Sequence, residues 1–186
     1  MTDTSEYSAD VTIRNRLGLH VRPVQRFAEL ARAFKADVEV QVRNRSVPGK
    51  SVMNLMSLGG RANDPMKITA RGDDARQCVD VLRLLAENSF FVEDNVDVSD
   101  QPMRHVERLA RIAACFDSEI MVTEDGKNAD AKQSDALAAM GLTPDSRPQF
   151  EIHGDDQEQA RAVVENLVRN YFYVEEAMIE AGREKT

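Results

Sequence analysis

The feature that most constrains this fold is an internal repeat: the chain matches itself when it is shifted by 82 residues. From residue 22 onward this one offset serves without a gap. The matched pairs are Phe34 with Phe116, Lys50 with Lys132, Leu55 with Leu137, Gly59 with Gly141, Gly72 with Gly154, and Phe90 with Phe172. Such self-similarity indicates one structural unit written twice. We therefore expect two domains, at residues 8–92 and 93–178, with no Gly/Ser-rich or Pro-rich linker between them.

The hydrophobic periodicity of the first copy alternates between strand and helix patterns. We expect strands where apolar residues alternate with polar ones, and helices where they recur every three to four positions. The predicted strands are 10–14, 38–42 followed by a turn at Arg43-Asn44 and a return through Val47, and 66–70. The predicted helices run from Pro23 to Phe34, over a short stretch capped by Ser51, and onward from Gly72-Asp73-Asp74. This order, with its hairpins, favours an α+β fold with an antiparallel sheet.

The second copy departs from the first at its beginning. Val96 and Val98 pair with Val11 and Ile13 only at an offset of 85, so about three residues are missing between the first strand and the first helix. At the helix entry the second copy has 100–102, Asp-Gln-Pro, where the first has 18–20, Gly-Leu-His. We therefore expect a second domain of the same fold with a shortened loop and no nucleophile.

Composition excludes several classes of protein. No run of 18 apolar residues occurs and the N-terminus has no signal-peptide pattern, which predicts a protein of the cytoplasm without membrane insertion. Cys78 and Cys115 each lie in an apolar helical pattern, so both are expected to be small buried core residues rather than a disulfide. His105 and His153 lack a ligand cluster, so no metal or cofactor is expected.

The charge of the chain is uneven. The net charge is −8, which argues against a nucleic-acid partner. Residues 1–92 hold 14 Lys and Arg against 11 Asp and Glu, whereas 93–186 hold 10 against 21. Two interpretations stay open. In the first, the charge difference between the halves is only random divergence of two solvent-exposed surfaces. In the second, the first half docks acidic partners and the two halves attract each other.

The segment 18–23, Gly-Leu-His-Val-Arg-Pro, carries the chemistry. A histidine at a helix N-terminus faces backbone N–H groups that have no intrahelical partner, and these groups and the helix dipole favour an anion. A phosphoryl group on the imidazole of His20 would be that anion. Arg22 would offer planar, charged donors to its oxygens. The alternative is that His20 simply sits in a surface loop.

This string, followed by an apolar helix, resembles the active-site signature of the HPr family, the histidine phosphocarriers of the bacterial phosphotransferase system. Residues 50–59, Lys-Ser-Val-Met-Asn-Leu-Met-Ser-Leu-Gly, resemble the second signature of that family. The resemblance covers about residues 10–90. It implies two HPr-like open-faced β-sandwiches, each with an antiparallel four-stranded sheet and three helices on one face, the second one degenerate.

The resemblance also implies roles for individual residues. His20 would be phosphorylated by an enzyme I charged from phosphoenolpyruvate, and Arg22 would assist. The acceptor would be an enzyme IIA component or a regulator, and Ser51 would match the serine that an HPr kinase phosphorylates. Val52, Met53 and Met56 would form an adaptable apolar docking surface. Two alternatives stay open: Ser51 is an ordinary helix cap, and the three apolar residues pack in the core.

The second copy has lost these features. Gln133 stands at the position of Ser51, and Asp135 and Ala138 replace the two methionines. We therefore expect a phosphocarrier with one active and one degenerate domain, which is not an enzyme because it is itself the covalent intermediate. Two rival hypotheses are a phosphorylation-dependent regulatory binding module, not coupled to sugar transport, and an interaction scaffold that has lost phosphotransfer.

Overall fold

The computed structural model describes residues 5–91, 105–142 and 146–169, and the chain divides into two compact units, Met1–Pro102 and Met103–Thr186. The first unit holds β1 (Glu6–Thr12), α1 (Val21–Ala31), β2 (Asp37–Val42), β3 (Arg45–Pro48), α2 (Val52–Ser57), β4 (Pro65–Arg71), α3 (Ala75–Glu87) and the short 3-10 helix η1 (Ser89–Phe91). The second holds α4 (His105–Ala113), β5 (Glu119–Glu124), β6 (Lys127–Asp130), α5 (Ser134–Met140), β7 (Gln149–His153) and α6 (Gln157–Leu167). The predicted α+β class is confirmed.

The sheet of the first unit has four antiparallel strands in the order β1-β4-β2-β3. Strand β2 alternates exposed and buried positions, so that Val38, Val40 and Val42 all point into the core. Alternation of this kind turns one face of a sheet toward apolar packing and leaves the other to water. The turn at Arg43-Asn44 that the sequence predicted joins β2 to β3, and Arg43 adopts a φ of 55°.

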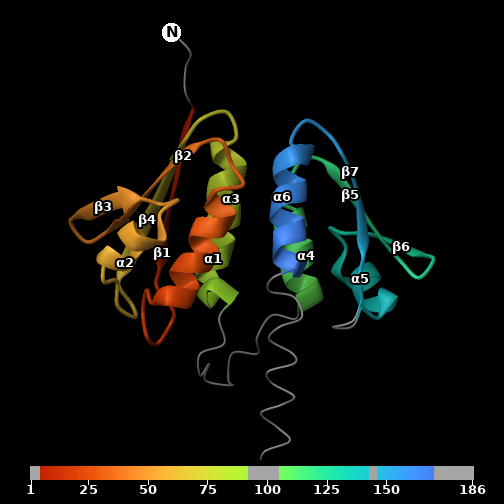
Figure 1. The fold of residues 1–186 in the computed structure, drawn as a ribbon, viewed down its shortest axis with the longest axis horizontal. Helices are drawn as coiled ribbons and strands as arrows, with labels where there is room; N and C mark the ends of the chain where they lie inside the picture. Colours follow the sequence, from red (N-terminus) through yellow and green to blue (C-terminus); the bar gives the residue numbers. More distant parts are fainter. Residues whose placement is uncertain (1–4, 92–104, 143–145, 170–186) are drawn as a thin grey trace, which may run out of the picture. The chain divides into compact units, whose positions relative to one another are not determined.

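Helices α1 and α3 lie side by side along the apolar face of this sheet, and α2 lies beside β3 (Figure 1). Helix α1 buries its apolar stripe, with Val24, Phe27 and Leu30 each at most 2% exposed. Helix α3 buries Cys78, Val81, Leu82 and Leu85 in the same way, as its periodicity predicted. The first unit therefore has one continuous core between sheet and helices.

Two boundaries differ from those predicted. Strand β1 begins at Glu6 and ends at Thr12, because its pairing with β4 extends over that whole length. Helix α1 begins at Val21 rather than at Pro23, which makes Pro23 its third residue. Pro23 is still tolerated there, because a first-turn residue has no intrahelical use for an N–H.

The described part of the second unit repeats the element order of the first from α1 to α3. Its sheet has the order β6-β5-β7, with both pairings antiparallel. The residues that match the core of the first unit at the repeat offset, Phe116, Ile120, Val122, Leu137, Val163 and Leu167, are all buried. The expected first strand with Val96 and Val98, and the shortened loop at 100–102, lie outside the described residues.

The repeat extends to individual hydrogen bonds. The Asp74 carboxylate accepts from the main-chain N atoms of Lys35 and Ala36 at 2.7 and 2.8 Å. At the same offset, Asp156 accepts from Asp117 and Ser118 at 2.7 and 2.9 Å. The Nζ atoms of Lys50 and Lys132 donate to the carbonyls of Phe34 and Phe116, both at 2.8 Å. Shared contacts of this kind confirm that one scaffold is used twice.

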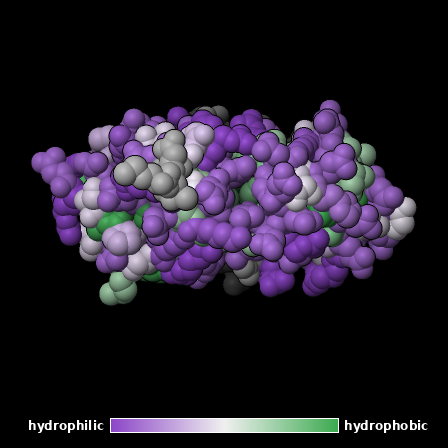
Figure 2. All heavy atoms as spheres, turned by 90° about the horizontal axis from the view of Figure 1, so that it is seen from above, coloured by the Kyte–Doolittle hydropathy of each residue, from purple (hydrophilic) through white to green (hydrophobic). Residues whose placement is uncertain are grey.

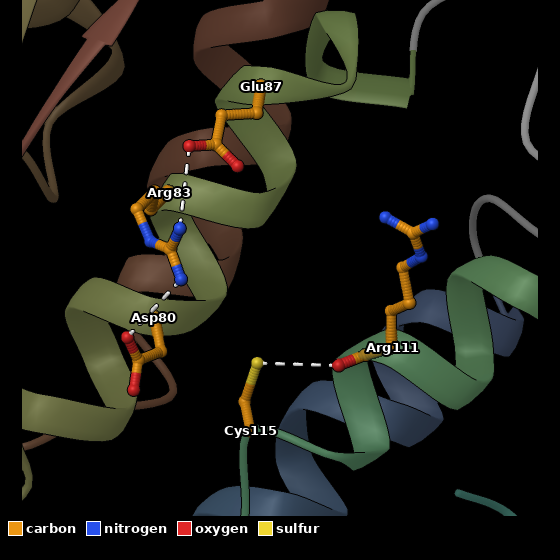
Figure 3. A network of polar contacts seen from close by, with 5 residues as sticks. All are labelled: Asp80, Arg83, Glu87, Arg111 and Cys115. Atoms are coloured by element: carbon orange, nitrogen blue, oxygen red, sulfur yellow. Dashed lines mark hydrogen bonds and ion pairs between the residues drawn. The ribbon is translucent and has the colours of Figure 1, made fainter.

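One face of the molecule is mainly polar. Figure 2 shows a largely hydrophilic face with only small apolar patches. On the outer side of α3, Arg83 lies between Asp80 and Glu87, at 3.8 and 3.5 Å (Figure 3). Exposed ion pairs of this kind contribute little to stability. Among the described residues, no helix is long and apolar enough to cross a membrane.

Candidate functional site

His20 is the N-cap residue of α1, with extended backbone angles (φ −105°, ψ −175°). Its carbonyl accepts the first hydrogen bond of the helix, from the main-chain N of Val24 at 3.2 Å. Its side chain makes no capping hydrogen bond. The first-turn N–H groups of this eleven-residue helix thus follow directly after His20 in the chain, and a helix N-terminus favours an anion.

The loop before His20 is held by close backbone contacts. Gly18 has a φ of 67° and donates from its N to the carbonyl of Asn15 at 2.9 Å. A Cβ atom at Gly18 would lie 2.2 Å from the carbonyl oxygen of Gly60, so only glycine fits. The N of Leu19 then donates to that same oxygen at 2.8 Å. The loop is therefore docked on the turn that follows α2.

The surroundings of His20 are accessible, basic and apolar. The ring is half-buried, and its Nε2 atom is shielded from solvent. Arg22 is exposed on the first turn of α1, and Arg16 is exposed on the loop. Leu17 and Val21, which flank His20 closely in the chain, are 58% and 57% exposed. The structure thus brings cationic and apolar side chains to the surface on both sides of the histidine.

Ser51 is the N-cap residue of α2, and its Oγ accepts from the main-chain N of Asn54 at 3.4 Å. Of the helix's apolar residues, only Leu55 is buried. Met53 is 79% exposed, and Val52 and Met56 are half-buried. These three side chains are available to a partner rather than enclosed in the core, while docking itself stays a prediction.

The end of α1 is tied to the residue before Ser51. Arg32 donates from Nε to the carbonyl of Lys50 at 2.9 Å. The Nζ of Lys50 in turn donates to the carbonyl of Phe34 at 2.8 Å. At the offset of the repeat, Lys132 keeps the second of these contacts, whereas Ala114 stands in place of Arg32. The link from Arg32 is thus a feature of the first unit.

Sequence reasoning did not single out two buried polar residues near the site. Asn15 is 4% exposed and donates from Nδ2 to the carbonyl of Ser89 at 3.0 Å. Arg26 is 9% exposed and donates from Nη1 to the carbonyl of Phe90 at 3.1 Å, and also to that of Phe91. A signal for Arg26 was present in the sequence, since it lies three residues after Pro23 and four before Leu30, at the edge of the apolar face of the helix. No local pattern marks Asn15.

The two cysteines differ from each other. Cys78 is buried as expected, and this burial raises the pKa of its thiol from 9.0 to about 12, with a smaller contribution from nearby Asp74. Cys115 is half-buried, and its Sγ contacts the carbonyl of Arg111 at 3.4 Å (Figure 3). The expectation that Cys115 is a buried core residue is therefore wrong, because the residue lies after the end of α4 and stays partly exposed.

The described positions of the second unit that correspond to Ser51, Met53 and Met56 carry other residues. Gln133 is the N-cap residue of α5 but makes no capping hydrogen bond with its side chain. Asp135 and Ala138, in place of the methionines, are exposed. His153 is exposed on β7. Within the parts of the chain that the structure describes, no three His, Cys, Asp or Glu side chains gather as metal ligands.

Comparison with known proteins adds family evidence. The family model described as "PTS HPr component phosphorylation site" matches residues 7–88 and again residues 99–170. A Phosphocarrier protein HPr of Cupriavidus necator is 33% identical over 81 residues, which cover 44% of this chain and 91% of that protein. A solved HPr structure from Thermoanaerobacter tengcongensis is 34% identical, with a TM-score of 0.45, over 47% of this chain and 98% of that one.

Other relatives are much longer proteins. The phosphoryl donor subunit DhaM of the PEP-dependent dihydroxyacetone kinase of Escherichia coli is 34% identical over 94 residues. A Multiphosphoryl transfer protein of Xanthomonas campestris pv. campestris is 38% identical over 93 residues. Half of this chain matches in each case, but only 20% and 11% of those relatives is covered.

Proposed function

Since this chain belongs to the HPr family, whose model matches it twice, we propose that its first unit accepts a phosphoryl group on His20 and passes it to an acceptor protein. The observation that carries the proposal is the place of His20 as N-cap residue of α1. A phosphoryl group at that position is stabilised by the first-turn N–H groups and by the positive end of the helix dipole. The chain is then the covalent intermediate of the transfer and not a catalyst.

The geometry favours Nδ1 as the attacking nitrogen, because Nε2 is shielded from solvent. Nδ1 attacks phosphorus, and the bond between phosphorus and the donor breaks as the P–N bond forms. Onward transfer reverses these roles, with the imidazole as the leaving group. In such transfers the protein contributes mainly positioning and charge stabilisation, and exposed Arg22 supplies charged donors to the phosphoryl oxygens.

We assign the donor as an enzyme I charged from phosphoenolpyruvate, and the acceptor as an enzyme IIA-type component. Exposed Met53, with Val52 and Met56, forms the adaptable apolar surface on which these partners dock. Ser51 is the site at which an HPr kinase would regulate docking, since its phosphate would stand beside that surface. The same hydroxyl is the cap of α2, and capping and phosphorylation are compatible.

The test is incubation with enzyme I and phosphoenolpyruvate, followed by intact mass at alkaline pH. We expect one acid-labile, alkali-stable phosphoryl group, its loss in His20→Ala, and its retention in the control His153→Ala. Phosphate that maps to His105 or His153 would overturn the assignment.

A second candidate, a phosphorylation-dependent binding module without a link to sugar transport, is favoured by one observation. The second unit keeps its core but has Gln133, Asp135 and Ala138 where the first has Ser51 and two methionines. A simple carrier needs one unit only. Capture of an enzyme IIA component by the phosphorylated chain, with phosphate transferred to it, favours the carrier. Stable binding of a regulator without transfer favours the module.

A further inference from the structure

The described part of the first unit ends in a turn of unusual backbone geometry, here called the exit turn (Ser89–Phe91). All three residues have positive φ, at 53°, 58° and 53°. None is glycine, and non-glycine residues pay a steric cost in this region, so the surroundings must hold them there. Phe90 and Phe91 are 1% and 2% exposed, and the Phe90 ring packs on that of Phe27 with centroids 6.3 Å apart. The exit turn is therefore anchored in the core against α1.

The carbonyls of the exit turn are bound by side chains from both sides of His20. On the loop before the histidine, Asn15 donates to Ser89 at 3.0 Å. On the helix after it, Arg26 donates to Phe90 and Phe91. Asn15 also accepts from the N of Gly18 through its own carbonyl. One residue thus connects the exit turn with the backbone that leads into His20.

The contacts made by Arg26 and by Asn15 differ in whether the second copy shares the residue. The repeat places Arg108 at the position of Arg26, and Arg108 is also buried, at 8% exposed. A buried arginine that recurs in the unit without the histidine belongs to the scaffold. Asn15 lies instead in the stretch that the second copy shortens, so it accompanies the histidine loop.

Asn15 is also a costly residue for this position. Its Oδ1 is buried and accepts no hydrogen bond from any part of the chain that the structure describes. An unsatisfied buried acceptor is unfavourable, and an apolar side chain would avoid the cost. Residues that break a local rule in this way concentrate at functional sites. Folding alone therefore does not account for an asparagine here.

We propose that Asn15 is a positioning residue for His20, which fixes the histidine loop by holding it to the exit turn. This inference rests on the proposed function of His20. The main-chain carbonyl of Asn15 sets the turn at Gly18, and its side chain fixes that carbonyl relative to α1. The tie holds the imidazole in line with the first-turn N–H groups of the helix, which is the orientation that phosphoryl transfer needs.

The test compares Asn15→Ala with a matched control, Asn88→Ala. Asn88 makes the same kind of bond, from Nδ2 to the carbonyl of Leu84 at 2.7 Å, directly before the exit turn. Its bond stays within the end of α3 and does not reach the histidine loop. Each variant loses one side-chain-to-carbonyl bond. We expect the midpoint of denaturation to fall by a similar amount in both variants.

Two measurements in the full chain separate positioning from stability. We expect the rate of His20 phosphorylation by charged enzyme I to fall about tenfold or more in Asn15→Ala and to stay near wild type in Asn88→Ala. In the unphosphorylated chain, the NMR ring signal of His20 should shift or broaden only in Asn15→Ala. If the two variants match in rate and in ring signal, Asn15 is structural only and the proposal is wrong.

Two further cases have their own tests: a variant that does not fold, and a wild-type chain that takes no phosphate. Should Asn15→Ala not fold, Asn15→Ser retains a small polar side chain that is too short to reach Ser89, and the same comparison applies. If the wild-type chain takes no phosphate on His20, the proposed function fails, whereas the ring signal still decides whether Asn15 positions the histidine.

Discussion

At the scale of single residues, charge and exposure around His20 decide what the site can do. A phosphoryl group must be stabilised on the imidazole and yet leave it readily. Arg22 lies on the exposed first turn, two residues from the histidine, and its guanidinium offers several donors in one plane. A lysine at that position keeps the positive charge but concentrates it on one ammonium group and lacks the planar set of donors.

Arg22→Lys should therefore slow phosphoryl transfer to His20 while the fold persists. We expect a loss of about tenfold in rate, which corresponds to about 1.4 kcal/mol of transition-state stabilisation. Stopped-flow or quench measurements with charged enzyme I would give the rate, and thermal unfolding would report the fold. The control is Arg16→Lys, an exposed basic residue of the same loop. Transfer at the wild-type rate in Arg22→Lys would mean that the guanidinium does not contact the phosphoryl group.

The two cysteines should differ sharply in reactivity. Burial raises the pKa of Cys78 to about 12, so its thiol stays neutral and enclosed at pH 8, whereas Cys115 is half-buried. A thiol reagent should label Cys115 alone in the native chain and both cysteines in denaturant, as peptide mass would show. Labelling should vanish in native Cys115→Ser. Equal labelling of both in the native chain would contradict the burial of Cys78.

The same pKa predicts how stability depends on pH. The unfolded chain ionises Cys78 near pH 9.0, while the folded chain holds the thiol neutral until about 12. The contribution of this group to stability is therefore complete below pH 9 and is lost as the pH rises from 9 toward 12.

The sequence predicted a residue's role in the site only where that role depends on its neighbours in the chain. The Gly-Leu-His-Val-Arg-Pro string predicted a histidine at a helix entry, and Ser51 predicted the cap of a short helix, because both depend on neighbours in the chain. The contact between Asn15 and Ser89 joins residues 74 positions apart. A polar side chain that is buried by such a distant contact carries no local pattern.

At the scale of elements, α2 is short and leaves three of its four apolar side chains at least partly exposed to solvent. Only Leu55 is buried, while Met53 is largely exposed. The helix begins directly after Ser51, whose hydroxyl caps it, and Lys50 donates to the carbonyl of Phe34, beyond the end of α1. A charge added at Ser51 would therefore stand at the edge of the apolar surface without disturbing the core.

Ser51→Asp should weaken phosphoryl transfer to His20 with little loss of stability. Phosphate adds about −1.5 to −2 charges at neutral pH, which the aspartate imitates in part, and aspartate is itself a good N-cap residue. Steady-state kinetics with enzyme I would show a raised KM for the variant. Ser51→Asn is the matched control, because it caps the helix equally well without a charge. Identical kinetics for both variants would count against a regulatory serine.

At the scale of the whole molecule, one scaffold appears twice with one set of supporting bonds. In each unit an aspartate directly before a helix, α3 or α6, accepts from two main-chain N–H groups that directly precede a strand, β2 or β5. Each is 8% exposed. Charge-assisted bonds to buried donors are among the stronger polar contributions to stability.

Loss of either aspartate should therefore destabilise its own unit. We expect Asp74→Ala and Asp156→Ala each to cost about 2–4 kcal/mol, because two buried N–H groups lose their acceptor. Hydrogen exchange, read peptide by peptide, should show the loss in residues 5–91 for the first variant and in 105–169 for the second. His20 should still take phosphate in Asp156→Ala. Loss of protection in the first unit of that variant would show that the units do not fold independently.

The repeat made the architecture of this molecule predictable. From residue 22 onward, the gapless offset transferred the inferences about the core of the first copy to the second. The buried residues Phe116, Ile120 and Leu137 confirm that transfer. Periodicity was less exact at the ends of elements. The start of β1 depends on its pairing with β4. The start of α1 depends on the loop that docks on Gly60. Hydrophobic periodicity carries no information about either contact.

The duplicated aspartate bonds have a consequence for how such chains can change. They hold sheet to helix in a unit that has no Gly-Leu-His string, so the scaffold does not need the chemistry that it displays. Mutations can then alter the loop ahead of the first helix while the core survives, and a duplicated copy is free to acquire a new surface. The second unit is in this sense a recipient into which residues 15–23 could be transplanted. A transplant that carried His20 without Asn15 would bring the nucleophile but not the side chain that we expect to orient it.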